Sequence, residues 1–98
     1  MNIEKIYNGN ELTIKLDGNL DTLSFPQYEQ EVIPELENAQ SLVLDFANLH
    51  YLSSAGLRVI LITQKKMENK GGMIIRNVNP EILNIFKMTG FDTFLNIE

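Results

Sequence analysis

The sequence contains no cysteine, no tryptophan and only one histidine among its 98 residues. Without cysteine there are no disulfides, no thiolate catalysis and no zinc sites of the cysteine type. His50 has no ligand partner at a spacing such as H-x3-H, and no D-x-D-x-D-G run is present, so we expect no metal site. A Ser-His-Asp triad is disfavoured because Ser53 and Ser54 do not lie in a G-x-S-x-G elbow. We therefore predict that no residue is catalytic and that the chain is not an enzyme.

Long apolar runs and an excess of positive charge are missing as well. No uninterrupted apolar stretch approaches the roughly 20 residues of a membrane span, and the N-terminus lacks the apolar core of a signal peptide. The formal net charge is -5 and the pI about 4.8. This balance argues against nucleic acid or an anionic lipid surface as the main ligand. We expect a cytoplasmic protein without membrane insertion or direct nucleic-acid contact, whose partners are other proteins.

The residues that are present fit one globular domain spanning 1–98, since 44% are hydrophobic and 21% are charged. Apolar and polar side chains alternate over 2–7 and 12–16, and Asn8-Gly9-Asn10 lies between these segments. This pattern predicts a β-hairpin. Asp17-Gly18-Asn19 is expected to break the second strand.

Three further strands are expected. Residues 42–46 carry apolar side chains on both faces, which is typical of a buried central strand. We predict a turn at Asn48-Leu49-His50 after this strand. Residues 73–76 and 94–97 are each long enough for a short strand, the second of them at an edge of the sheet.

The first helix is predicted to begin after Ser24, which stands three residues before Gln27 in the spacing of a reciprocal cap. Pro26 in the first turn supports this start. Pro34 predicts a kink or an early stop, because an interior proline removes a backbone donor. The side of this helix expected to pack is formed by Phe25, Tyr28, Val32 and Leu36.

The second helix should begin near Ser54 and end near Asn69, and the third should run from Asn79-Pro80 to Gly90. The expected core stripe of the second helix is Leu57, Ile60, Leu61 and Met67. The expected packed face of the third is Ile82, Leu83, Ile85, Phe86 and Met88. The resulting order of elements predicts an α/β fold, with a mixed β-sheet, an N-terminal hairpin and helices packed on the sheet.

The segment from Tyr51 to Leu57 is the strongest candidate site, because two hydroxyls and two small residues lie where a buried strand meets a helix. Open α/β sheets bind ligands beyond the carboxyl ends of their strands, and a helix N-terminus offers free N–H groups. The alternative is that Ser53 or Ser54 caps the helix, as serine commonly does. A serine can cap the helix and also take part in recognition, and we expect Ser54 to keep a capping role.

Asp21 is a second candidate. It follows the second strand much as Ser54 follows the third, so both side chains share one rim of the sheet if these strands are parallel neighbours. The alternative is turn or capping chemistry near Ser24. Asp45 is interpreted as structural. Gly71-Gly72 lacks the residues of a phosphate loop and predicts only a helix stop, so we expect no cofactor.

Three stretches, taken together, resemble the STAS family and in particular its small bacterial anti-sigma factor antagonists. Gly18-Asn19-Leu20-Asp21 is similar to the family's G-x-L-D motif. Residues 42–46 together with 51–57 are similar to its central signature, and Met88-Thr89-Gly90-Phe91 to its late M-x-G-[LF] motif. The three stretches span nearly the whole chain in the family's order.

The resemblance implies a STAS fold and a partner-switching role. In the family the partner is an anti-sigma factor serine kinase of the GHKL ATPase type, which also sequesters a sigma factor, and a PP2C-type phosphatase reverses the modification. The phosphorylated residue matches Ser54. Ser53 stands where the family often has Asp, and is the alternative acceptor. In the family, the nucleotide bound during this exchange belongs to the kinase and not to the antagonist. The partner-binding residues we assign are Asp21, Ser53, Ser54, Ala55, Gly56 and Arg58.

Phosphorylation at a helix N-terminus is tolerated by the helix dipole, so we expect the fold to survive it. The added charge should instead repel the partner beside Asp21. Family members commonly continue past the position of Glu98 into another helix, whose contacts we expect to be absent or replaced here. The main alternative is a constitutive STAS subunit of a signalling or lipid-transport assembly. A small-ligand-binding domain has no polar pocket signature to support it.

Overall fold

The computed structural model describes residues 1–98, which form a five-stranded sheet in the order β1-β2-β3-β4-β5. β1 is antiparallel to β2, and every other neighbouring pair is parallel. The strands are β1 (Asn2–Asn8), β2 (Glu11–Leu20), β3 (Ser41–Leu52), β4 (Met73–Arg76) and β5 (Asn96–Ile97). The predicted mixed sheet with an N-terminal hairpin is confirmed.

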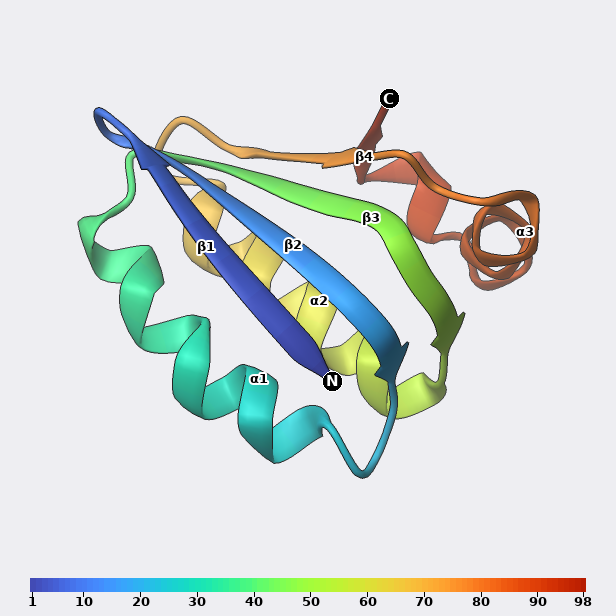
Figure 1. The fold of residues 1–98 in the computed structure, drawn as a ribbon. Helices are drawn as coiled ribbons and strands as arrows, with labels where there is room; N and C mark the ends of the chain where they lie inside the picture. The colour runs from blue at the N-terminus through green and yellow to red at the C-terminus, as the bar shows by residue number, and fades with distance from the viewer.

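Helices connect the parallel strands. They are α1 (Phe25–Glu31), the 3-10 helix η1 (Ile33–Asn38), α2 (Ser54–Met67), α3 (Pro80–Thr89) and the 3-10 turn η2 (Phe91–Thr93). In Figure 1, α2 runs behind β1 and β2 with α1 beside it, while α3 stands apart near the end of β4. α1, η1 and α2 pack on one another, and α2 and α3 each contact β3. None of these helices is long and apolar enough to cross a membrane.

The buried side chains of β2 and β3 form the centre of one hydrophobic core. Leu12, Ile14 and Leu16 alternate along β2, and all three are nearly inaccessible to solvent. Leu42, Leu44 and Phe46 do the same along β3. The helices add Tyr28, Val32, Leu36, Val59, Ile60, Met67, Ile82 and Phe86. The period of two in the sequence therefore marks the face of the sheet that packs against helices.

Two predicted strand ends are wrong. β2 continues through Asp17-Gly18-Asn19 to Leu20, and β3 continues through the predicted turn at Asn48-Leu49-His50 to Leu52. The two strands stay paired over these segments because the register shifts twice, once between Lys15 and Asp17 and once after Gly18. Such irregularities absorb an extra residue and bend a strand without ending it. The extension carries both strands to the rim where the candidate site lies.

The first helix differs from its prediction at its start. Ser24 precedes α1 but makes no capping hydrogen bond, and the Gln27 side chain donates instead to the Met1 carbonyl over 2.9 Å. The predicted reciprocal cap between Ser24 and Gln27 is therefore wrong. Ser24 Oγ is hydrogen-bonded to the backbone of the preceding loop instead. The stop at Pro34 is confirmed: α1 ends at Glu31, and Pro34 lies in the first turn of η1. A proline is compatible with the first turn of a helix.

The buried face of α2 is rotated from its predicted position. Ile60 and Met67 are buried as expected, whereas Leu57 and Leu61 are half-buried. The other buried positions of α2 are Gly56, Val59 and Thr63. Thr63 fits in the core because its hydroxyl donates to the Val59 carbonyl over 2.7 Å and shares a 2.9 Å hydrogen bond with the Tyr28 hydroxyl. This buried pair links α1 to α2.

α3 begins and ends as predicted. Asn79 Oδ1 accepts a 2.8 Å hydrogen bond from the Ile82 amide, and Gly90 ends the helix in a left-handed conformation. Ile82 and Phe86 are fully buried, but Met88 is 78% exposed. The prediction that Met88 packs in the core is wrong. The last strand is confirmed only as Asn96–Ile97, since Phe94 and Leu95 form a turn between η2 and β5.

Candidate functional site

The candidate site lies where β2 and β3 end side by side. Leu20 pairs with Leu52 at the last position of the parallel ladder. The Ser53 amide then donates to the Leu20 carbonyl over 3.0 Å. The loop that begins at Asp21 and the helix that begins at Ser54 therefore leave the sheet from one rim, as the sequence predicted for parallel neighbours.

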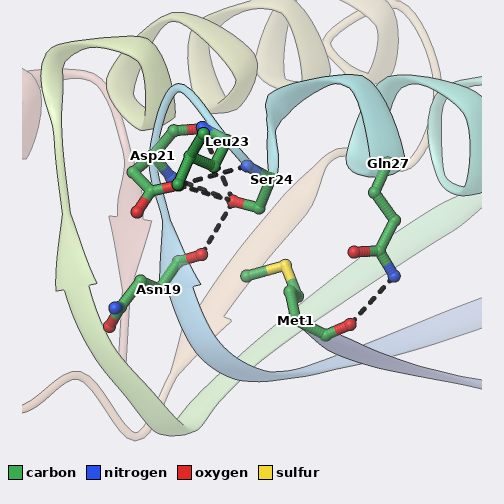
Figure 2. A pocket seen from close by; sticks show the side chains of 6 residues that line it. All are labelled: Met1, Asn19, Asp21, Leu23, Ser24 and Gln27. Atoms are coloured by element: carbon green, nitrogen blue, oxygen red, sulfur yellow. Dashed lines mark hydrogen bonds between the residues drawn. The ribbon is translucent and has the colours of Figure 1, made fainter.

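The loop after β2 is held by side-chain hydrogen bonds (Figure 2). Asp21 Oδ1 accepts from the backbone amides of Leu23 and Ser24, over 3.0 and 3.1 Å. Ser24 Oγ accepts from the Asp21 amide over 3.0 Å and donates to the Asn19 carbonyl over 2.7 Å. The turn chemistry considered for Asp21 is thus confirmed. Asp21 Oδ2 takes part in none of these bonds.

A shallow hollow of about 220 Å³ lies beside this loop. Its lining is Met1, Asn19, Asp21, Leu23, Ser24 and Gln27. Figure 2 shows Gln27 on one side of the hollow, with its side-chain amide bonded to the Met1 carbonyl. Asp21 lies on the other side. Leu23 is 90% exposed, the highest value among the large hydrophobic residues exposed on the surface. Sequence reasoning did not single out Leu23, because a lone leucine in a loop carries no signal of exposure.

Ser53 and Ser54 have different environments. Ser53 is half-buried, is the N-cap of α2 and accepts a long hydrogen bond, 3.4 Å, from the Gly56 amide. Ser54 is the first residue of α2, is exposed, and its hydroxyl takes part in no hydrogen bond within the chain. The expectation that Ser54 caps the helix is therefore wrong. The cap falls on Ser53 because its amide is fixed by Leu20 at the end of the ladder.

The small residues of the signature pack against the chain itself. A Cβ atom on Gly56 would lie 2.4 Å from the Leu20 carbonyl oxygen and 2.6 Å from a methyl carbon of Leu52. Gly56 is buried and Ala55 is half-buried. Gly56 therefore allows the backbone of β2 to approach α2 closely.

Arg58 follows Ser54 by about one helical turn and is exposed on the solvent side of α2. Its guanidinium takes part in no ion pair, because the two ion pairs of the chain join Lys5 to Glu35 and Arg76 to Glu98. Ser54 and Arg58 therefore present two unengaged polar groups at the same end of the helix.

Asp45 lies away from this rim, and its interpretation as structural is supported. Its Oδ1 accepts from the Ala47 amide over 2.9 Å and from Asn77 Nδ2 over 3.0 Å. Burial by itself would raise the pKa of Asp45, but these hydrogen bonds and the positive charges of Lys15 and Arg76 outweigh it and lower the pKa. Asp45 thus stabilises the sheet in its ionised form.

The family model for the STAS domain matches residues 2–98. The anti-sigma F factor antagonist of Paenibacillus polymyxa is 30% identical over 93 residues, which cover 92% of this chain and 80% of that protein.

Two solved structures have the same fold. An anti-sigma factor antagonist from Mycobacterium paratuberculosis superposes with a TM-score of 0.89 at 20% identity, over 98% of this chain and 83% of the other. The Bacillus protein SpoIIAA in its phosphorylated form gives a TM-score of 0.76 at 18% identity, over 99% and 91% of the two chains. The family model matches almost the whole sequence and the fold agrees with it, so the chain belongs to the STAS domain family.

Proposed function

We propose that this chain is an anti-sigma factor antagonist whose unphosphorylated form binds an anti-sigma factor serine kinase and so releases a sigma factor. Phosphorylation of Ser54 abolishes that binding. The observation that carries the proposal is the exposed Ser54 hydroxyl, which makes no hydrogen bond within the chain, whereas the neighbouring Ser53 and Ser24 hydroxyls are both bonded. The name of the Paenibacillus relative and the phosphorylated state of SpoIIAA support it.

The choice of Ser54 over Ser53 follows from access. A kinase must place a γ-phosphate in line with the attacking hydroxyl, with the reacting atoms about 3 to 3.5 Å apart. Ser54 meets this requirement without breaking a bond of the fold. Phosphorylating Ser53 would require its half-buried hydroxyl to give up the Gly56 amide. Ser53 is therefore the weaker acceptor.

Asp21 supplies a fixed negative charge at the same rim. Its Oδ1 is occupied by the loop, which leaves Oδ2 free to accept from a donor of the partner. A phosphate on Ser54 adds about -1.5 to -2 charge units to this surface. A cost of about 3 kcal/mol at the interface weakens binding roughly 100-fold. The helix dipole favours the same phosphate, so the fold persists.

The proposed partners are a kinase of the GHKL type and a phosphatase of the PP2C type, both acting in the cytoplasm. The kinase supplies the nucleotide, so the chain works without a cofactor and as a binding module rather than an enzyme. The unit that does this is the domain 1–98. The proposed contact surface and the residues packed directly beneath it are Asp21, Ser53, Ser54, Ala55, Gly56 and Arg58.

Calorimetric titration of a GHKL-type kinase from the same organism tests this proposal. Ser54→Ala is expected to bind like the parent and to resist phosphorylation. Ser54→Asp is expected to bind roughly 100-fold more weakly with an unchanged circular dichroism spectrum. Ser53→Ala is the matched control and should still accept phosphate. Equal affinity of Ser54→Ala and Ser54→Asp would overturn the switch.

Intact-mass measurement of the protein from cells is an independent check. A phosphate adduct that maps to Ser54 is the expected result. If no adduct is found on Ser53 or Ser54 under any growth or stress condition, the chain is a constitutive STAS subunit instead.

A further inference from the structure

Ser54 and Arg58 lie on one exposed strip of α2. An α-helix turns 100° per residue, so side chains four residues apart are about 40° apart around the axis and about 6 Å apart along it. Both residues are exposed, whereas Gly56, Val59 and Ile60 between and after them are buried. The strip therefore faces solvent at the end of the helix nearest the Asp21 loop.

The Arg58 guanidinium has no competing anion on its own helix. The residues three and four positions away from it are Ser54, Ala55, Leu61 and Ile62, and all are uncharged. The first turn of α2 contains no acidic residue. A negative charge can therefore arise next to Arg58 on this helix only if Ser54 is phosphorylated.

We propose that Arg58 is the intramolecular counter-ion of the phosphate on Ser54, an inference that rests on the proposed phosphorylation. The guanidinium fork donates two N–H groups to phosphate oxygens in a charge-assisted contact. An anion four residues before a cation is also the favourable order on a helix. The residue types, their spacing and their exposure all suit this contact.

This contact gives phosphorylation a second effect on the partner-facing surface. The modification replaces a hydroxyl by a dianion, and it also draws a free guanidinium toward the phosphate and away from the partner. An interface that uses Arg58 in the unphosphorylated form loses that donor when Ser54 is modified. The switch thus removes an attraction as well as adding a repulsion.

The second ionisation of the phosphate reports the contact directly, and phosphorus NMR follows it in the isolated protein. Phosphoserine is placed at position 54 during translation, so no kinase is needed. The titration is run at low ionic strength on the parent, on Arg58→Gln and on Lys65→Gln. Lys65 is an exposed cation of the same helix that lies about 16 Å from Ser54 along the axis, so its variant makes the same charge change at a distance from the phosphate.

The phosphate ordinarily ionises with a pKa near 6. We expect the phosphate pKa to be about 0.2 to 0.4 higher in Arg58→Gln than in the parent. This difference corresponds to the loss of one ion pair of this spacing on a helix, which favours the dianion. Lys65→Gln should leave it unchanged. Salt of about 1 M should remove the difference. The charged residue at this rim from another segment is Asp21, which is the same in every variant.

An unchanged pKa in Arg58→Gln would overturn the inference, and so would an equal shift in Lys65→Gln. Either result leaves the proposed phosphorylation standing. Conversely, an absence of phosphate on Ser54 in cells would overturn the proposed function. The titration would still decide whether Arg58 pairs with a phosphate placed at position 54. The two failures are therefore distinguishable.

Discussion

The two sides of the candidate site are held in different ways. The Asp21 loop is fixed by side-chain hydrogen bonds, with Asp21 and Ser24 each bonded to the other's backbone amide. The start of α2 is fixed by backbone packing, because Gly56 lies directly on the Leu20 carbonyl. Only the second arrangement leaves a hydroxyl free, that of Ser54.

This difference shows how a modification site can coexist with a rigid rim. Polar groups that hold a loop by hydrogen bonds are no longer available to a partner, as Asp21 Oδ1 and Ser24 Oγ illustrate. Close packing of glycine against a carbonyl fixes α2 without using any side-chain polar group. The helix is therefore positioned by Gly56, capped weakly by Ser53, and left with Ser54 available.

Gly56→Ala is the strongest way to break the comparison. Alanine favours a helix over glycine by about 1 kcal/mol, but its Cβ would clash with the Leu20 carbonyl at 2.4 Å. The clash should dominate, and we expect the free energy of unfolding in urea to fall by about 3 kcal/mol or more. Gly72→Ala is the control. Its backbone has φ +85° but open space around the added Cβ, so we expect a loss of about 1 to 2 kcal/mol.

Similar losses for these two glycine variants would contradict the idea that packing positions α2. A Gly56→Ala protein as stable as the parent would mean that the Leu20 carbonyl moves aside, and that the rim is held by the Asp21 loop alone.

Replacing the serines one at a time sharpens the comparison. Ser24→Ala should lower the free energy of unfolding by about 1 to 2 kcal/mol, because it removes partners from the Asp21 amide and the Asn19 carbonyl. Ser53→Ala should cost about 0.5 to 1 kcal/mol, since its capping bond is long at 3.4 Å. Ser54→Ala should stay within about 0.5 kcal/mol of the parent. A cost for Ser54→Ala as large as that for Ser24→Ala would make its hydroxyl structural.

Asp45 provides a reference outside the candidate site. Like Asp21, it accepts from the amide two residues later, and its pKa is lowered in the folded state. A lowered folded pKa means that the stabilisation is complete above the unfolded value of about 3.9 and is lost as the pH falls through the folded value. Urea unfolding between about pH 5 and pH 2.5 should therefore show a smaller loss of stability in Asp45→Asn than in the parent. An equal loss in both proteins would assign the acid sensitivity to other carboxylates.

The elements that the sequence predicted correctly depend on neighbours along the chain. Asn79 caps α3, Pro34 ends α1, and the alternation in β2 marks its buried face. Each depends on a backbone rule that acts over a few residues, such as the missing N–H of proline or the free amide at a helix start. The start of α2 near Ser54 was predicted as well, but which of the two serines caps the helix was not.

The elements predicted wrongly depend on pairing across the sheet. Asp17-Gly18-Asn19 has the composition of a turn, but pairing with β3 keeps it in β2 through a register shift. Met88 has the composition of a core residue, yet the rotation of α3 on the sheet leaves it in solvent. Sequence spacing alone carries no information about either contact.

The sequence by itself determined the order of the elements, the buried face of β2 and the presence of two serines at a helix start. Only the tertiary structure decided which serine is free. The last bond of the β2–β3 ladder, from the Ser53 amide to the Leu20 carbonyl, fixes the residue at which α2 begins. It makes Ser53 the cap and leaves Ser54 exposed, and no local rule distinguishes the two, because both serines are equally good capping residues.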